Sequence, residues 1–206
     1  MSEPLDLVVV VLAGGQGRRM GGSKPLRAYG ATTLIGRSLK LARGYGQTVA
    51  VAVRDPMQVG GAHVAHCLID DPCVGGPIAG LASGLAFAGR RGARAVLTMP
   101  CDAPDLPADL AVRLRASLAA NVAVAVAASC GRLQPTCALW RAETAALLPA
   151  YIASGRSSLR GFAEACGMIE VSWAVDAGDP FANANTLEDL QRLQLGAAPR
   201  AITFGA

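Results

Sequence analysis

A loop rich in glycine and positive charge follows the first apolar run of the chain. Residues 7–12 read Leu-Val-Val-Val-Val-Leu, and residues 13–24 read Ala-Gly-Gly-Gln-Gly-Arg-Arg-Met-Gly-Gly-Ser-Lys. Glycine permits positive φ and lets backbone amides approach a bound group closely. The arginines and Lys24 add positive charge suited to phosphate oxygens. The loop therefore predicts a phosphate-binding site, and a solvated glycine-rich turn is the alternative interpretation.

Two well-known phosphate-binding loops do not fit this stretch. A Walker loop needs Gly-Lys followed by Ser or Thr, whereas Lys24 follows Ser23 and precedes Pro25. The dinucleotide fingerprint G-x-G-x-x-G, counted from Gly15, needs glycine where this chain has Met20. The identity of the ligand must therefore be sought in other segments.

Asp102 is the carboxylate best placed to complement this loop. It follows the apolar run 95–99 and lies between Pro100 and Pro104, which stiffen its turn. Such a carboxylate suits Mg²⁺, which takes one or two protein carboxylates plus phosphate oxygens; capping of a turn is the alternative role. No Ser-His-Asp or Cys-His arrangement is visible, so positioning and charge neutralisation of a phosphoryl group are favoured over a covalent intermediate.

The apolar stretches that must position these residues alternate between strand and helix patterns. We expect strands at 7–12, 48–53, 67–69, 95–99, 121–127, 134–140 and 169–173, and helices at 33–44, 75–88, 107–119, 142–153, 157–165 and 186–195. This order predicts an α/β fold whose sheet has parallel members and helices on both faces. Ligands of such sheets bind at the carboxyl ends of the strands, so the loops beginning at Ala13, Asp70, Pro100 and Asp179 are expected to meet.

Composition limits the classes of protein to which this chain can belong. The chain has 206 residues, 52% of them hydrophobic, which predicts one domain over 1–196, followed by a loosely held tail at 197–206. The net charge of +4 is too small, and the arginines too scattered, for a nucleic-acid-binding protein. No apolar run approaches the roughly 18 residues of a membrane span, and the N-terminus lacks a signal-peptide pattern, so a cytoplasmic location is expected.

Five segments, in order, resemble the molybdenum cofactor guanylyltransferases, which are nucleotidyltransferases. Residues 12–24 resemble the family's signature loop, 76–81 its G-P-L-A-G-L, 100–104 its P-C-D-x-P, 134–139 a further segment, and 181–190 its F-x-N-I-N-T-P-E-D-L. The resemblance implies a Rossmann-like three-layer α/β/α fold with a mostly parallel sheet. It also implies transfer of GMP from GTP to the phosphate of molybdopterin, or of its molybdenum-loaded form, with release of pyrophosphate and with Mg²⁺ as cofactor. Cofactor-delivery proteins or molybdoenzymes are implied as partners.

The resemblance also assigns residues. Nucleotide binding falls on Leu12, Ala13, Gly14, Gly15, Lys24, Gly76 and Asp102, catalysis on Arg19, Lys24 and Asp102, and the metal on Asp102. In the family an acidic residue before G-P-L-A-G-L contacts guanine; Asp70 and Asp71 both qualify here, and Asp70 is favoured. Asn183 and Asn185 align with asparagines near the second substrate and the metal.

A small basic group precedes the last strand. Arg156 and Arg160, with Ser154 and Ser157, are suited to the acceptor phosphate because arginine forks match phosphate oxygens. A solvated helix end is the alternative interpretation.

The chain departs from the family's pattern just before Lys24. The family usually has Gly-Gly-x-Asp-Lys, whereas residues 21–24 are one residue shorter and lack the aspartate, as in the cytidylyltransferase relatives. Two other features differ from those relatives. They usually have alanine then glycine where this chain has the second glycine of residues 12–15, and they tend to carry aspartates where it has Asn183 and Asn185. The alternatives are therefore a molybdenum cofactor cytidylyltransferase, a sugar-phosphate nucleotidylyltransferase, or a non-catalytic protein that binds nucleotide and escorts the cofactor.

Overall fold

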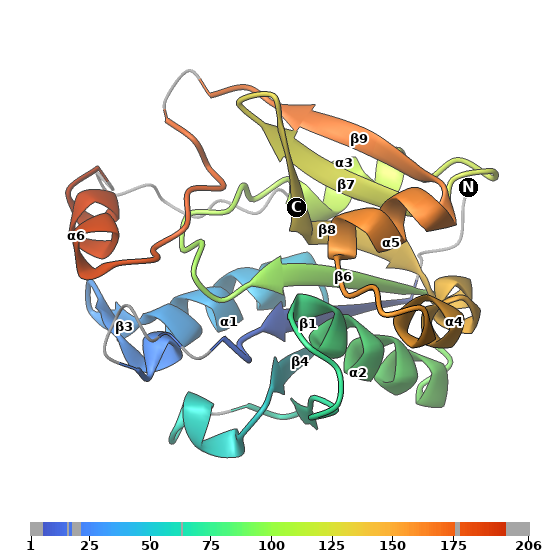
Figure 1. Ribbon diagram of the computed structural model, residues 1–206. Helices are drawn as coiled ribbons and strands as arrows, with labels where there is room; N and C mark the ends of the chain where they lie inside the picture. Colours follow the sequence, from blue (N-terminus) through green and yellow to red (C-terminus); the bar gives the residue numbers. More distant parts are fainter. Residues whose placement is uncertain (1–5, 16, 18–21, 63, 176–177, 197–206) are drawn as a thin grey trace.

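A central sheet organises the molecule (Figure 1). The computed structural model describes residues 6–15, 17, 22–62, 64–175 and 178–196, so Arg19 and the expected tail at 197–206 lie outside the described residues. In the described part, seven strands form the sheet: β1 (Leu7–Leu12), β4 (Thr48–Val53), β5 (Cys67–Ile69), β6 (Ala95–Pro100), β7 (Val124–Ser129), β8 (Arg132–Arg141) and β9 (Met168–Trp173). Their order is β5-β4-β1-β6-β8-β7-β9, and neighbours pair in parallel except at β8, which is antiparallel to β6 and β7. The predicted mostly parallel sheet is confirmed.

Helices cover both faces of the sheet. They are α1 (Leu34–Tyr45), α2 (Pro77–Arg90), α3 (Leu110–Ala116), α4 (Leu148–Ala153), α5 (Leu159–Cys166) and α6 (Leu187–Gly196). Val9 and Val11 of β1 belong to the core that includes α1 and α3, whereas Val8 and Val10 belong to the core that includes α2, α4 and α5. This alternation follows from the period of two in a strand, and it explains why β1 is apolar throughout. The three-layer α/β/α arrangement is confirmed.

The strand order reverses beside β1. The chain passes from β1 to β4 and β5 on one side, and α2 then carries it to β6 on the other side. Leu12 pairs with both Ala52 and Pro100, so three parallel strands end at the same level. Ligands of α/β sheets bind at such a reversal, beyond the carboxyl ends of the strands. In Figure 1 this edge lies on the left, where the arrowheads of β1 and β6 point toward α6.

Several predicted boundaries were inaccurate. The helix expected at 107–119 is confined to α3, and the one expected at 142–153 is divided into a 3-10 helix η4 (Ala142–Ala146) and α4. Pro149 lies in the first turn of α4, where its missing N–H costs little. The hairpin of β2 (Ala28–Tyr29) and β3 (Thr32–Thr33) was not predicted, because two-residue strands give no periodic signal. Thr33 caps the start of α1, where its side chain accepts from the Gly36 N–H at 3.1 Å.

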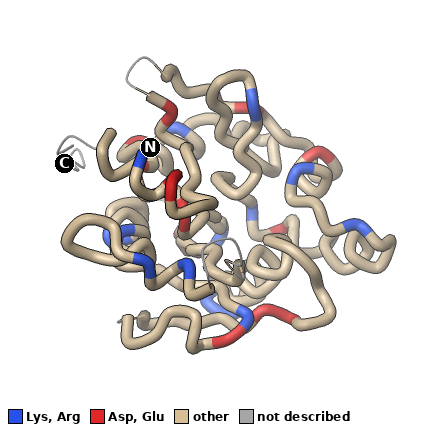
Figure 2. Tube along the Cα trace, turned by 60° about the vertical axis from the view of Figure 1, so that its left-hand side comes forward, with Lys and Arg blue, Asp and Glu red and all other residues tan. Residues whose placement is uncertain are grey.

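Charged residues of both signs are interspersed along the described trace (Figure 2). Along the part of the chain that the structure describes, the positive charges are therefore not gathered in one basic stretch. Among the described helices, none combines the length and apolar character that crossing a bilayer requires.

Candidate active site

A cavity of about 210 Å³ lies at the carboxyl ends of β1, β4 and β6. Gly76 and Pro77 bring the N-terminal end of α2 to it, and that end of a helix carries partial positive charge. Its lining residues in the described part are Leu12, Gly14, Gly15, Ala52, Arg54, Asp70, Gly76, Pro77, Gly80, Pro100, Asp102 and Thr136. Loops that are far apart in the sequence thus meet here, as the strand order requires.

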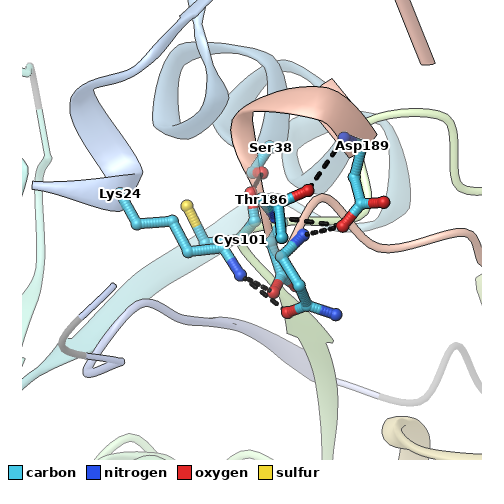
Figure 3. Close-up of polar contacts among 7 residues, drawn as sticks. Lys24, Ser38, Cys101, Thr186 and Asp189 are labelled. Carbon is cyan, nitrogen blue, oxygen red and sulfur yellow. Dashed lines mark hydrogen bonds and ion pairs between the residues drawn. The ribbon is translucent and has the colours of Figure 1, made fainter. Parts of the chain in front are cut away.

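Three segments meet at the Asp102 end of the cavity. Lys24 Nζ forms an ion pair with Asp102 Oδ2 and donates to Asn185 Oδ1 at 3.1 Å. Lys24 begins a 3-10 helix η2 (Lys24–Leu26), Asp102 follows β6, and Asn185 precedes α6; Figure 3 shows the Lys24 side chain reaching toward the segment of Thr186. The Lys24 and Asp102 side chains are only 14% and 22% exposed. Partial burial lowers the effective dielectric constant, so charge here acts more strongly than on an open surface.

The close approach of Lys24 depends on a glycine. Gly17 has a φ of 57°, and a Cβ built on it would lie 2.6 Å from Lys24 Cβ. The Gly17 carbonyl accepts from the Gly22 N–H at 3.0 Å, which closes the loop just before Lys24. Both the backbone conformation and the lack of space exclude a side chain at residue 17.

Asp70 lies at the opposite end of the cavity, because it follows β5 whereas Asp102 follows β6 on the other side of β4 and β1. Its side chain is buried, Oδ1 lies 3.4 Å from the Ser83 hydroxyl, and a Cβ on Gly14 would lie 2.6 Å from Oδ2. Burial raises the pKa of the Asp70 carboxyl, although the Ser83 hydrogen bond and the charge of Arg54 oppose the shift. The cavity therefore has a second carboxylate, which lies close to the backbone at Gly14 and, among the described residues, has the Ser83 hydroxyl as its side-chain donor.

Asp71 has a different environment from Asp70. It is exposed, and its Oδ1 accepts from the Cys73 N–H at 2.8 Å in a local turn. The Asp70 N–H donates to the Val53 carbonyl at 2.8 Å, which extends the β4–β5 pairing by one residue. Side chains alternate along a strand, so Asp70 lies on the same side as buried Leu68 and Asp71 does not.

The donor set at Asp102 fits a cation that is shared with a phosphate. Among the residues that the structure describes, no group of three or more His, Cys, Asp or Glu side chains gathers as a metal site. The Lys24 ammonium nevertheless lies between oxygens of Asp102 and Asn185, so two oxygen ligands already converge on one positive charge. Mg²⁺ is commonly held in this way, by one or two protein oxygens together with substrate phosphates.

The other predicted site residues take no part in the contacts described above. Asn183 is exposed, two residues before Asn185, and Ala13 is buried in the core below the loop. Arg156 is exposed, donates to Ser154 Oγ at 2.9 Å and has its guanidinium carbon 4.2 Å from the Tyr151 ring centroid, whereas Arg160 pairs with Glu164 on its own helix. The structure brings neither arginine into the described lining of the cavity.

Two lining residues with polar side chains, Arg54 and Thr136, were not predicted. Arg54 directly follows the valine-rich strand β4, and a charged residue at the carboxyl end of a parallel strand was a usable signal. Thr136 reaches the cavity from a bulge: Val126 pairs with Ala138 and Ala127 with Gln134, so residues 135–137 have no partner on β7. Bulges redirect side chains near functional sites, and no periodicity in the sequence indicates this one.

Known proteins are similar to this chain over most of its length. Residues 9–169 match the family model described as a MobA-like NTP transferase domain. A molybdenum cofactor guanylyltransferase of Cereibacter sphaeroides is 37% identical over 200 residues, covering 92% of this chain and 96% of that protein. One of Rhodopseudomonas palustris is 40% identical over 189 residues, covering 88% and 89%.

Solved structures share the fold. The molybdopterin-guanine dinucleotide biosynthesis protein A of Archaeoglobus fulgidus has a TM-score of 0.73 at 21% identity, covering 94% of this chain and all of that chain. The 4-diphosphocytidyl-2C-methyl-D-erythritol synthase of Anaerococcus prevotii has a TM-score of 0.71 at 13% identity, covering 92% and 96%. The family model covers most of the chain and the relatives nearly all of it, so this chain belongs to the family of MobA-like NTP transferase domains.

Proposed function

We propose that this protein transfers GMP from GTP to the phosphate of molybdopterin or its molybdenum-loaded form. An oxygen of the acceptor phosphate attacks the α-phosphorus of GTP in line. A new P–O–P linkage forms, the bond from the α-phosphorus to the bridging oxygen of the β-phosphate breaks, and pyrophosphate leaves. The relatives named molybdenum cofactor guanylyltransferase, which match this chain over most of its length, support the proposal.

The observation that carries the proposal is a single cavity with two carboxylates in contrasting environments. Asp70 lies buried at one end, and the Lys24–Asp102 pair lies at the other. Guanine presents adjacent N–H donors, which a carboxylate can accept with both oxygens, whereas cytosine presents an acceptor beside its amino group. Asp70, favoured over Asp71, is therefore assigned to the base, with Leu12, Gly14, Gly15 and Arg54 around it.

The end of the cavity with the Lys24–Asp102 pair is assigned to the triphosphate of GTP. Lys24 binds phosphate oxygens as a mobile point charge, and the start of α2 at Gly76 adds its positive dipole end. A Mg²⁺ ion held by Asp102 together with phosphate oxygens would neutralise the charge that develops on the leaving pyrophosphate. Arg19, which belongs to the segment that resembles the family's signature loop, is assigned to the same phosphates.

The acceptor is assigned to the outer part of the same edge. Asn185 already contacts Lys24, and Asn183 lies on the same segment. The Ser157 carbonyl is 3.8 Å from the position of a Cβ on Gly76, so the loop carrying Arg156 passes close to the cavity. Arg156 and Arg160 are exposed and able to turn toward an incoming phosphate once they leave their local partners.

Release of pyrophosphate from each nucleotide tests the proposal. The purified protein is mixed with molybdopterin, Mg²⁺ and GTP, CTP, UTP or ATP in turn. The proposal expects turnover with GTP and little with the others, because only guanine offers two donors to Asp70. Turnover with CTP alone identifies a cytidylyltransferase, and turnover with a sugar phosphate in place of molybdopterin identifies a sugar-phosphate enzyme. GTP binding without any pyrophosphate identifies the escort protein and contradicts the proposal.

The setting of the reaction follows from its substrates. GTP is a nucleotide of the cytoplasm, so we place the reaction there, with cofactor-delivery proteins or molybdoenzymes as recipients of the product. A single nucleotidyltransferase domain over residues 1–196 carries it.

A further inference from the structure

Backbone carbonyls in the turn that carries Asp102 accept hydrogen bonds from two other segments of the chain. The Cys101 carbonyl accepts from Ser38 Oγ at 3.1 Å, and the Pro104 carbonyl accepts from Arg37 Nε at 2.7 Å. The Asp102 carbonyl accepts from the Ala184 N–H at 2.8 Å. The strand β6 ends at Pro100, so the sheet ladder does not bond these groups. Helix α1 and the segment before α6 fix the turn instead.

Arg37 is itself fixed by a second carboxylate. Its Nη2 lies 3.1 Å from Asp105 Oδ1, and Asp105 Oδ2 accepts from the Tyr29 hydroxyl at 2.7 Å. Burial and this hydrogen bond raise the pKa of Tyr29, so the phenol stays protonated as a donor. The guanidinium is a rigid planar fork, and one arginine thereby joins α1, the Pro104 carbonyl and Asp105 in a single orientation.

Ser38 is fully buried on the next position of α1. Its hydroxyl lies 2.9 Å from the Leu34 carbonyl and 3.1 Å from the Cys101 carbonyl, so its one hydrogen is shared between two acceptors. Figure 3 shows Ser38 close to Cys101, just behind the turn that Lys24 approaches. An alanine here would remove the donor of a buried carbonyl, and leaving a buried acceptor unpaired costs free energy.

We propose that Arg37 and Ser38 are positioning residues for Asp102. Neither lines the described part of the cavity, and both act on the backbone on either side of the aspartate. Displacement of a catalytic group by about 1 Å can lower a rate roughly 100-fold, so a strand-terminal turn that carries such a group needs this restraint. The inference rests on the proposed role of Asp102 as the residue that holds the cation.

A pair of matched arginine variants tests the proposal. Arg113 makes the same kinds of contact elsewhere: it donates to the Ser172 carbonyl at 2.7 Å and pairs with Asp109 at 3.8 Å. Arg37→Met is compared with Arg113→Met, and Arg37→Lys keeps the charge but loses the planar fork. The readout is Mn²⁺ affinity, measured by electron paramagnetic resonance of free Mn²⁺ with a non-hydrolysable GTP analogue bound.

The expected pattern separates positioning from general stability. Arg37→Met should weaken Mn²⁺ binding by about 10-fold or more, because loss of an outer partner of a metal ligand typically has that effect. Arg37→Lys should lie between it and the wild type, and Arg113→Met should leave Mn²⁺ affinity unchanged. Thermal melting of each variant shows whether it is folded. Wild-type Mn²⁺ affinity in folded Arg37→Met or Arg37→Lys overturns the role of Arg37.

The serine has its own control. Ser117 Oγ donates to the Arg113 carbonyl at 3.0 Å, which reproduces the bond of Ser38 within its helix without one to a neighbouring turn. Ser38→Ala should weaken Mn²⁺ binding several-fold, whereas Ser117→Ala should not. Equal Mn²⁺ affinities for these two variants overturn the role of Ser38.

An Asp102→Asn variant distinguishes failure of this inference from failure of the proposed function. If Asp102→Asn loses Mn²⁺ binding and Arg37→Met and Ser38→Ala do not, the inference alone is wrong. If Asp102→Asn binds Mn²⁺ as well as the wild type, the metal role of Asp102 and its positioning fall together. Mn²⁺ affinity does not depend on turnover, so the answer holds whichever nucleotide or acceptor proves to be the substrate.

Discussion

Asp70 and Asp102 lie at opposite ends of one cavity and have contrasting surroundings. Asp102 has a cationic partner in Lys24, and its turn is held by α1 and by the segment before α6. Asp70 is buried and lies beside the exposed Arg54, and within the described part of the chain its side-chain hydrogen bond is a long one, to the Ser83 hydroxyl. A carboxylate already paired with a cation suits metal and phosphate, whereas a buried carboxylate with unused acceptor capacity suits the N–H donors of a base. The different neighbours of the two aspartates therefore support the different roles that we propose for them.

The glycine loop contributes to both ends in the same physical way. A Cβ at Gly14 would lie 2.6 Å from Asp70 Oδ2, and one at Gly17 would lie 2.6 Å from Lys24 Cβ. Each glycine therefore makes room for one charged side chain of the cavity. In the proposed function, the loop thus separates the end assigned to the base from the end assigned to the phosphates.

The largest effect is expected at Asp102. Asp102→Ala should lower the rate of pyrophosphate release by roughly 100-fold or more, because a preorganised charge at the reacting phosphate is lost. Circular dichroism should show an unchanged fold, since Asp102 is partly exposed and its backbone bonds remain. A variant that turns over at the wild-type rate would remove Asp102 from the mechanism.

Replacement of Lys24 should cause the next largest loss of rate. Lys24→Met removes the partner of Asp102 and a phosphate ligand together, so we expect a rate roughly 100-fold lower and a higher KM for GTP. The chain offers a natural control, because Lys40 is its only other lysine and is exposed on α1. Lys40→Met should behave as wild type in the same assay; equal losses in both variants would indicate a nonspecific effect of charge.

At the base end, the effect should appear in binding rather than in chemistry. Asp70→Asn should weaken GTP binding about 10- to 100-fold, since hydrogen bonds to a charged group contribute about 1.5–3 kcal/mol. Calorimetry with GTP and CTP measures both affinity and discrimination. Asp71→Asn is the control, because Asp71 is exposed and bonded within its own turn. A larger loss at Asp71 than at Asp70 would reverse the assignment of the two carboxylates.

Gly14→Ala should also disturb the Asp70 end of the cavity, with a smaller effect on GTP affinity than Asp70→Asn. Its Cβ would force the Asp70 carboxylate or the loop to move, so we expect GTP affinity to fall several-fold. Gly61→Ala is a suitable comparison, because a Cβ there meets nothing within 4 Å. Unchanged GTP affinity in Gly14→Ala would show that the loop yields without disturbing Asp70.

The smallest expected effect is on stability. Burial raises the pKa of Asp70, so between the ordinary aspartate pKa and the raised value the native state binds more protons than the unfolded chain. The contribution of Asp70 to the free energy of unfolding therefore falls as pH rises through that window. Asp70→Asn should melt at a higher temperature than the wild type at neutral pH, and the difference should shrink toward pH 4. A variant less stable than the wild type at neutral pH would contradict this sign.

Much of the scaffold was predictable, because apolar periodicity marks strands and helices locally. The run at 7–12, the glycine loop and the prolines around Asp102 indicated a strand-terminal phosphate site without any knowledge of strand pairing. Arg54 and Thr136 escaped prediction because their places depend on strand order and on the bulge at 135–137. The contacts of Arg37 and Ser38 were not predicted for a similar reason, because nothing within α1 indicates which loop its polar side chains will contact.

The sequence by itself determined the layered α/β fold, and it made the glycine loop a candidate phosphate-binding site and Asp102 a candidate cation ligand, because these inferences follow from residue type and local spacing. Tertiary structure decided which carboxylate enters the cavity at the other end. The β4–β5 pairing extends to Asp70 and sends its side chain to the buried side with Leu68, while Asp71 turns to solvent. The two aspartates are chemically identical neighbours, so only strand register and packing could separate them.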